Sequence, residues 1–86
     1  MYLLVQHEVK DFDTWKKVYD DDVSARTEAG FEEVELLRGY ENPNWVVVLM
    51  SVKDPASARA FVTSDHLAEA MQNAGVVGTP IFTELQ

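Results

Sequence analysis

The sequence predicts an α+β domain in which four antiparallel strands form one sheet and two helices cover one of its faces. Residues 45–53 are mostly apolar and include three consecutive valines, whose branched side chains favour a pleated strand over a helix. Together with this segment, the regions of strand and helix periodicity occur in the order strand, helix, strand, strand, helix, strand. The 86 residues provide one domain, residues 1–86, with a small core.

The first predicted strand covers residues 2–9, and a helix follows it. One face of this strand contains Leu3, Val5, His7 and Val9. Asp11 or Asp13 is expected to cap a helix that runs to about Ala29, where Gly30 ends it. The apolar stripe of this helix, with spacings of three and four residues, consists of Phe12, Trp15, Val18, Tyr19 and Val23.

The second strand is predicted over residues 31–40, and a polar turn over 41–44 joins it to the central strand. Its two faces are expected to contain Val34, Leu36, Arg38 and Tyr40 on one side and Glu33, Glu35 and Leu37 on the other. Both faces of the central strand, residues 45–53, are apolar. We therefore expect both faces of that strand to be covered.

The second helical segment is predicted to begin with Asp54 as its cap and Pro55 in its first turn. Ser64 is expected to cap a second part of this segment, which runs through Ala74 and ends at Gly75. A turn-prone connection over residues 76–80 and a short edge strand over residues 81–85 then complete the chain.

With right-handed crossovers, this order of elements is the ferredoxin-like βαββαβ arrangement, with the first and third strands in the centre. Both helices then lie on one face of the sheet, and the other face has no cover within the chain. Burial of its area of roughly 350 Å² would contribute on the order of 9 kcal/mol per chain. We therefore expect a homodimer formed through the exposed sheet face.

The composition is acidic, with 15 Asp and Glu residues against 7 Lys and Arg and a net charge of −8. Such a surface repels phosphate backbones, so nucleic-acid binding is not expected. The chain has no cysteine for a disulfide or a thiol nucleophile, and only two histidines, so no metal site is expected either. Neither a signal peptide nor a membrane span is expected, and we predict a cytoplasmic protein without membrane contact.

Four stretches resemble a known family, namely residues 7–16, 37–39 together with 41–44, 58–61 and 67–76. Through them the sequence resembles the dimeric α/β-barrel superfamily, which includes antibiotic-biosynthesis-monooxygenase-like domains and many small bacterial proteins labelled cyclase or monooxygenase. The resemblance implies a homodimer, and activities that range from cofactor-free oxygenation and haem degradation to isomerisation and dehalogenation. His7 stands where the haem-degrading branch has an asparagine, so haem chemistry does not carry over and no cofactor is expected.

His7 and Arg38 are the candidate catalytic residues. His7 interrupts an apolar strand face and titrates near neutral pH, so it is suited to remove a proton from a phenol or enol. The alternative is a buried histidine bonded to a backbone or carboxylate group. Arg38 would bind the resulting anion, and the alternative is an ion pair at the sheet edge with one of the many acids.

Trp15, Tyr19 and His66 are the candidate binding residues. Trp15 and Tyr19 lie one helical turn apart and are expected to line an aromatic pocket, with the Tyr19 hydroxyl as a donor, although such a stripe also forms core. His66 lies roughly where the resemblance places a family histidine. A surface or capping role at the start of a helix is the alternative for His66.

These residues predict a cofactor-independent monooxygenase- or cyclase-like enzyme that acts on a small aromatic or polyketide-like molecule in a mostly apolar pocket. The alternatives are a module that binds a small apolar or aromatic ligand or acts in stress without catalysis, and a pure assembly domain. A cavity shared by His7 and Arg38 would favour the enzyme. A cavity filled by Trp15 and Met71 would favour the assembly domain.

Overall fold

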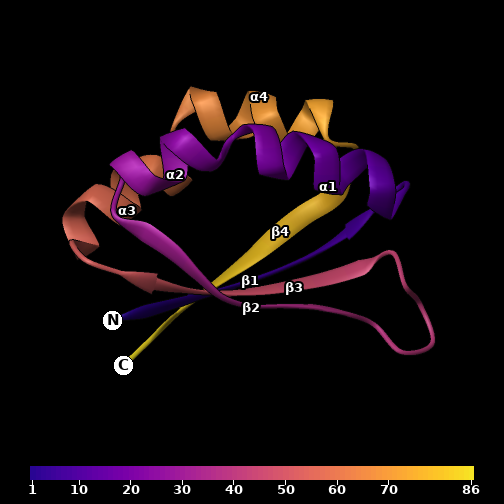
Figure 1. Cartoon of the computed structure of the whole chain (residues 1–86), viewed down its shortest axis with the longest axis horizontal. Helices are drawn as coiled ribbons and strands as arrows, with labels where there is room; N and C mark the ends of the chain where they lie inside the picture. Colours follow the sequence, from indigo (N-terminus) through magenta and orange to yellow (C-terminus); the bar gives the residue numbers. More distant parts are fainter.

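The computed structural model describes all 86 residues and contains two layers, with every helix on one face of a single sheet (Figure 1). The strands are β1 (Tyr2–Val9), β2 (Phe31–Arg38), β3 (Trp45–Val52) and β4 (Val76–Leu85). The helices are α1 (Phe12–Asp21), α2 (Val23–Glu28), α3 (Pro55–Val62) and α4 (Asp65–Asn73). The strand order is β2-β3-β1-β4 with antiparallel neighbours, which confirms the ferredoxin-like arrangement and its two central strands.

The core lies between the two central strands and the helices. Alternate residues of β1 and β3 point toward the helices because strand side chains alternate between faces. Val46 and Val48 of β3 are 0% and 1% exposed, and they are covered by a layer that includes Trp15 of α1 and Ala58 of α3. The prediction that the helix-facing side of the central strand is buried is thereby confirmed.

The first helical segment is not continuous to Ala29, as the sequence suggested, but breaks at Asp22. α1 is capped by Asp11, whose carboxylate accepts a hydrogen bond from the Thr14 amide at 3.0 Å. α1 ends with Asp20 and Asp21, and the next residue, Asp22, leaves the helical conformation with φ −92° and ψ 10°. Three adjacent carboxylates repel one another and oppose the negative end of the helix dipole, which is a physical reason for the break.

The second helical segment has the two parts that its caps predict. The Asp54 carboxylate accepts a hydrogen bond from the Ala56 amide at 3.2 Å, and Pro55 opens α3. Ser64 Oγ accepts one from the Leu67 amide at 3.2 Å and starts α4. Gly75 follows α4 with φ 79°, a conformation that favours glycine. None of the four helices is long and apolar enough to cross a membrane.

β2 contains a bulge that changes the predicted assignment of its faces and ends at Arg38, two residues earlier than expected. Glu33 pairs with Met50 and Glu35 pairs with Leu49, so Val34 is the extra residue. The bulge turns Glu33 toward the helices, on the same face as Arg38, whereas the sequence placed them on opposite faces. A regular alternation of residues cannot reveal a bulge, because the bulge inserts one residue into the pattern.

β4 begins at Val76, so the predicted connection over residues 76–80 is part of the strand. The pairing with β1 shifts between Gln6 and Glu8, and Gly78 lies at this irregularity with φ 71°. Gly78 and Pro80 therefore mark a bulge within an edge strand and not the end of a loop. The sequence signal for a bulge and for a turn is the same pair of residue types, which explains the wrong boundary.

The sheet face opposite the helices, which we call the open face, is uncovered (Figure 1). Its apolar side chains are Tyr2, Leu4, Leu37, Trp45, Val47, Leu49, Val77, Ile81 and Leu85. Leu37 and Ile81 are 55% and 50% exposed, which is unusual for large aliphatic side chains. An apolar patch that spans all four strands is typical of a surface that another protein covers.

Candidate functional site

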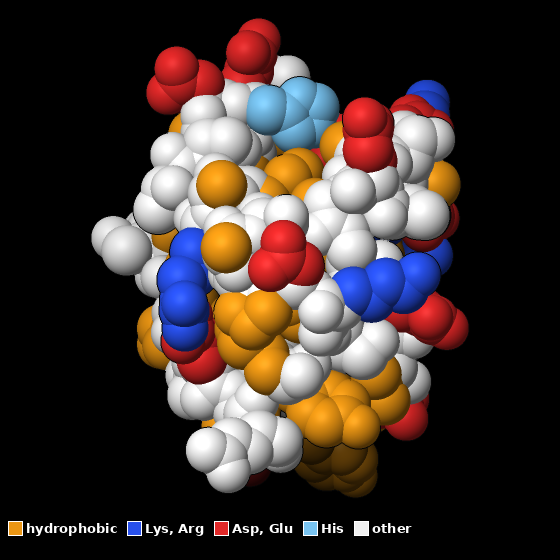
Figure 2. Space-filling view, turned by 90° about the vertical axis from the view of Figure 1, so that its left-hand side faces the viewer, with side chains coloured by type: hydrophobic (Ala, Val, Ile, Leu, Met, Phe, Trp, Pro, Cys, Tyr) orange, Lys and Arg blue, Asp and Glu red, His pale blue; other side chains and the backbone are white.

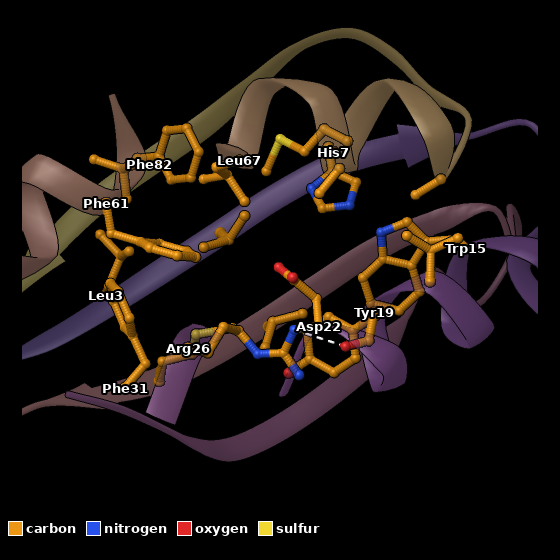
Figure 3. A pocket seen from close by; sticks show the side chains of 18 residues that line it. Leu3, His7, Trp15, Tyr19, Asp22, Arg26, Phe31, Phe61, Leu67 and Phe82 are labelled. Carbon is orange, nitrogen blue, oxygen red and sulfur yellow. Dashed lines mark hydrogen bonds between the residues drawn. The ribbon is translucent and has the colours of Figure 1, made fainter. Parts of the chain in front are cut away.

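An apolar pocket lies between the sheet and the helices (Figure 3). Its free volume is about 70 Å³, and 15 of its 18 lining residues are hydrophobic. The walls come from all four strands on the sheet side and from all four helices on the other side. His7, Trp15 and Tyr19, three of the five candidate residues from the sequence, line this pocket, as does Met71.

His7 is the only fully buried polar side chain of the protein, with 3% exposure. Neither Nδ1 nor Nε2 has a hydrogen-bond partner, and the ring lies 5.6 Å from the Trp15 ring. Burial lowers the pKa of His7 below its ordinary value of 6.5, because desolvation disfavours the charged imidazolium. A neutral imidazole has one donor and one acceptor nitrogen, so the pocket contains an unbonded group of each kind.

Trp15, Tyr19 and Arg26 form a stacked wall of the pocket. The Trp15 and Tyr19 rings are nearly parallel, with 4.7 Å between centroids and 19° between planes. The Arg26 guanidinium lies 3.7 Å from the centroid of the Tyr19 ring and donates through Nη1 to the Tyr19 carbonyl oxygen at 2.7 Å. Because His7 lies beside Trp15, this wall extends from the buried His7 imidazole to the Arg26 guanidinium.

The Tyr19 hydroxyl is used within the protein. It donates a hydrogen bond to Glu33 Oε1 at 2.9 Å, a contact that exists because the β2 bulge turns Glu33 toward the helices. Burial and this hydrogen bond raise the pKa of Tyr19 well above its ordinary value. Tyr19 therefore lines the pocket with its ring, and its hydroxyl is already bonded.

Arg38 does not line the pocket, and the structure does not bring it together with His7 around one cavity. Both residues pair with Val46, one from each neighbouring strand, so they lie two strands apart. The Arg38 guanidinium lies 3.8 Å from the centroid of the Phe12 ring, and Nε donates to the Pro43 carbonyl oxygen at 2.8 Å. Arg38 thus contacts α1 and the β2–β3 turn.

His66 lies outside the apolar pocket, in the first turn of α4. Its Nε2 is 2.8 Å from Asp22 Oδ1, and Asp22 itself lines the pocket. Figure 2 shows one histidine at the surface with acidic side chains on either side of it, and this is His66 because His7 is buried. The pair joins the break between α1 and α2 to the start of α4.

Arg26 and Asp22 are pocket residues that the sequence interpretation missed. Arg26 follows Tyr19 by seven residues, a spacing that returns to the same helix face, and this was the available signal. The predicted stripe of this helix included only apolar and aromatic side chains, so Arg26 was left out of it. No group of three or more His, Cys, Asp or Glu side chains converges in a geometry that holds a metal ion.

No protein-family model matches the chain, and no curated protein sequence matches it significantly. Solved structures do match. A candidate antibiotic biosynthesis monooxygenase from Bordetella bronchiseptica has a TM-score of 0.78 and 14% identity, covering 99% of this chain and 93% of that chain. SnoaB, a cofactor-independent oxygenase from Streptomyces nogalater, has a TM-score of 0.72 and 13% identity, and the match covers 99% of this chain and 91% of SnoaB. A further candidate antibiotic biosynthesis monooxygenase, from Nitrosomonas europaea, has a TM-score of 0.66 and 18% identity, and the match covers 96% of this chain and 94% of that chain.

These likenesses extend over nearly the whole of each chain and show a shared fold. They confirm the expected likeness in fold to antibiotic biosynthesis monooxygenases. Identities of 13–18% leave activity to be argued from the site itself.

Proposed function

We propose that this protein is a homodimeric, cofactor-independent enzyme of the monooxygenase or cyclase type, which binds a small aromatic molecule in the apolar pocket and uses His7 as general base. The observation that supports this most is the state of His7, a buried imidazole with two unbonded nitrogens in an apolar pocket. An unsatisfied buried polar group costs free energy, and such groups are concentrated at functional sites.

His7 is suited to accept a proton from a phenol or enol. Its lowered pKa keeps the imidazole neutral at pH 7, which is the form that acts as a base. Proton removal leaves an electron-rich anion. When such an anion reacts with O2 and a methylene carbon becomes a carbonyl, one oxygen atom enters the product and the other leaves as water, so the reaction requires no external electron donor.

The size of the pocket limits the ligand. Its free volume of about 70 Å³ is roughly half that of a ~150 Å³ engineered cavity that binds benzene. A single ring therefore requires small movements of the flexible side chains around it, such as Met71. We propose a one-ring aromatic ligand and not a multi-ring molecule.

The open face supports the homodimer. A second copy of the chain is a suitable partner, because it presents the same apolar patch and a two-fold arrangement covers both patches at once. The pocket lies on the opposite side of the sheet, so each subunit keeps its own pocket in this arrangement.

Phenol binding, observed by NMR, tests the proposal. Phenol should shift the His7 and Trp15 ring signals, and His7→Phe should weaken its binding roughly tenfold by removing the hydrogen bond. His66→Gln, outside the pocket, is the matched control and should bind like the wild type. Oxygen uptake with one-ring phenols that carry a methylene group then tests catalysis. Phenol that leaves both ring signals unchanged would contradict the proposed ligand site.

A ligand-binding module without catalysis is the second candidate function. The observation that favours it is that Arg38, the other candidate catalytic residue, does not line the pocket with His7. Tight phenol binding without turnover or oxygen uptake would identify this function.

A further inference from the structure

We infer that the pocket selects an aromatic carboxylate, with the Arg26 guanidinium as the receptor for the ligand's anionic group and His7 at the ligand's other end. This inference rests on the proposed function, because it uses the same pocket and adds the charge of the ligand and the residue that recognises it. Arg26 is the only Lys or Arg side chain among the 18 lining residues.

Arg26 is a half-buried cation without an acidic partner. The ion pairs of the protein are Lys16–Asp20, Arg59–Glu84 and His66–Asp22, and none of them includes Arg26. Its Nη1 donates to the Tyr19 carbonyl oxygen, whereas Nε and Nη2 donate to no protein atom. These two donors suit the paired oxygens of a carboxylate.

The guanidinium is held in place before a ligand binds. The Tyr19 ring supports it at 3.7 Å, and Trp15 and Glu33 hold Tyr19 through the stacked ring and the hydroxyl. Little side-chain entropy is then lost when an anion binds, which favours selective recognition. The same aromatic wall leads to His7 (Figure 3), so the ligand that we infer is flat, with its carboxylate at Arg26 and a hydroxyl toward His7.

Asp22 is the acidic residue that lines the pocket, and its side chain points into it (Figure 3). Its Oδ1 bonds to His66 and makes no ion pair with Arg26. The Asp22 charge therefore opposes an anionic ligand, while Arg26 attracts it. This opposition predicts effects of opposite sign for the two residues, which a purely structural role of either residue would not produce.

Two probes that differ in charge and not in shape test the inference, namely para-hydroxyphenylacetate and para-hydroxyphenylacetamide. Isothermal titration calorimetry would measure both affinities for the wild type and the variants, with NMR spectra to establish folding. We expect the acid to bind roughly tenfold more tightly than the amide in the wild type, and Arg26→Gln to abolish the difference. Arg26→Lys should keep part of it, and Asp22→Asn should increase it.

Arg38→Gln is the matched control. Arg38 also stacks on an aromatic ring and donates to a carbonyl oxygen, but it does not line the pocket, so the preference for the acid should remain. If the acid and the amide bound with equal affinity to the wild type, and also to Arg26→Gln, the inference would be overturned, whereas the pocket would remain a ligand site. Loss of the preference in Arg38→Gln would overturn it as well. If neither probe shifted the His7 and Trp15 signals, the proposed function would fail together with the inference.

Discussion

The burial of His7 makes the stability of the folded protein depend on pH. Its pKa is lowered in the folded state by burial, whereas the unfolded chain exposes it to water. Between the lowered value and the ordinary value of 6.5, the unfolded chain therefore binds more protons than the folded chain. The free energy of unfolding then gains nothing from this group above that range and decreases as the pH falls through it.

We predict that His7→Phe reduces this pH dependence. In the wild type, stability against urea should decrease as the pH falls below 6.5, and the slope should be smaller in the variant, which has no group to protonate at this position. Urea unfolding curves at several pH values between neutral and mildly acidic would measure both slopes. An identical slope in the variant would show that His7 is hydrated in the folded protein.

At the scale of the elements, the local breaks create the walls of the pocket. The break at Asp22 places this residue at the pocket beside α4, and the bulge in β2 brings Glu33 to Tyr19. The break at Ser64 divides the other helical segment in the same way. The break at Ser64 includes a side-chain cap, so a single substitution there can test how much α4 depends on its first turn.

We predict that Ser64→Ala destabilises the protein by about 1 kcal/mol, because α4 loses the side-chain oxygen that bonds the Leu67 amide. Ser64 Oγ also donates to the Phe61 carbonyl oxygen at 2.6 Å, a bond that would be lost as well. Ser24→Ala is the matched control, since Ser24 is exposed in α2 and makes no side-chain hydrogen bond. Chemical denaturation with equal midpoints for both variants would exclude Ser64 as a cap.

At the scale of the whole molecule, the two faces of β3 have different roles. Val48 points to the helices and is 1% exposed, whereas its neighbour Leu49 points to the open face. Substitutions at these two adjacent positions therefore test the stability of the subunit and its proposed assembly separately.

We predict that Val48→Asp unfolds the protein, because an unpaired buried charge costs several kcal/mol, comparable with the stability of a small domain. Leu49→Asp should leave a folded monomer, since the same charge then lies on the open face, through which we propose that two copies associate. Circular dichroism would report folding, and sedimentation velocity would report the mass. A Leu49→Asp variant that sediments like a dimeric wild type would exclude the open face as the interface.

Much of the fold could be predicted because it depends on periodicity and caps, which are local properties. The apolar alternation of β1 and β3 and the caps Asp54 and Ser64 led to the strand order and to the helices of the second half. The bulges at Val34 and Gly78 could not be predicted, because a bulge inserts a residue without changing the composition of the strand.

For the site, the sequence by itself determined that His7 interrupts an apolar face and that Trp15 and Tyr19 share a helix stripe. Only the tertiary structure decided which cation joins them. Arg38 lies two strands from His7, whereas Arg26, on the far side of a helix break, stacks on Tyr19. Proximity between side chains of different elements depends on strand order, on bulges and on where a helix ends, and none of these is a local property of the residues themselves.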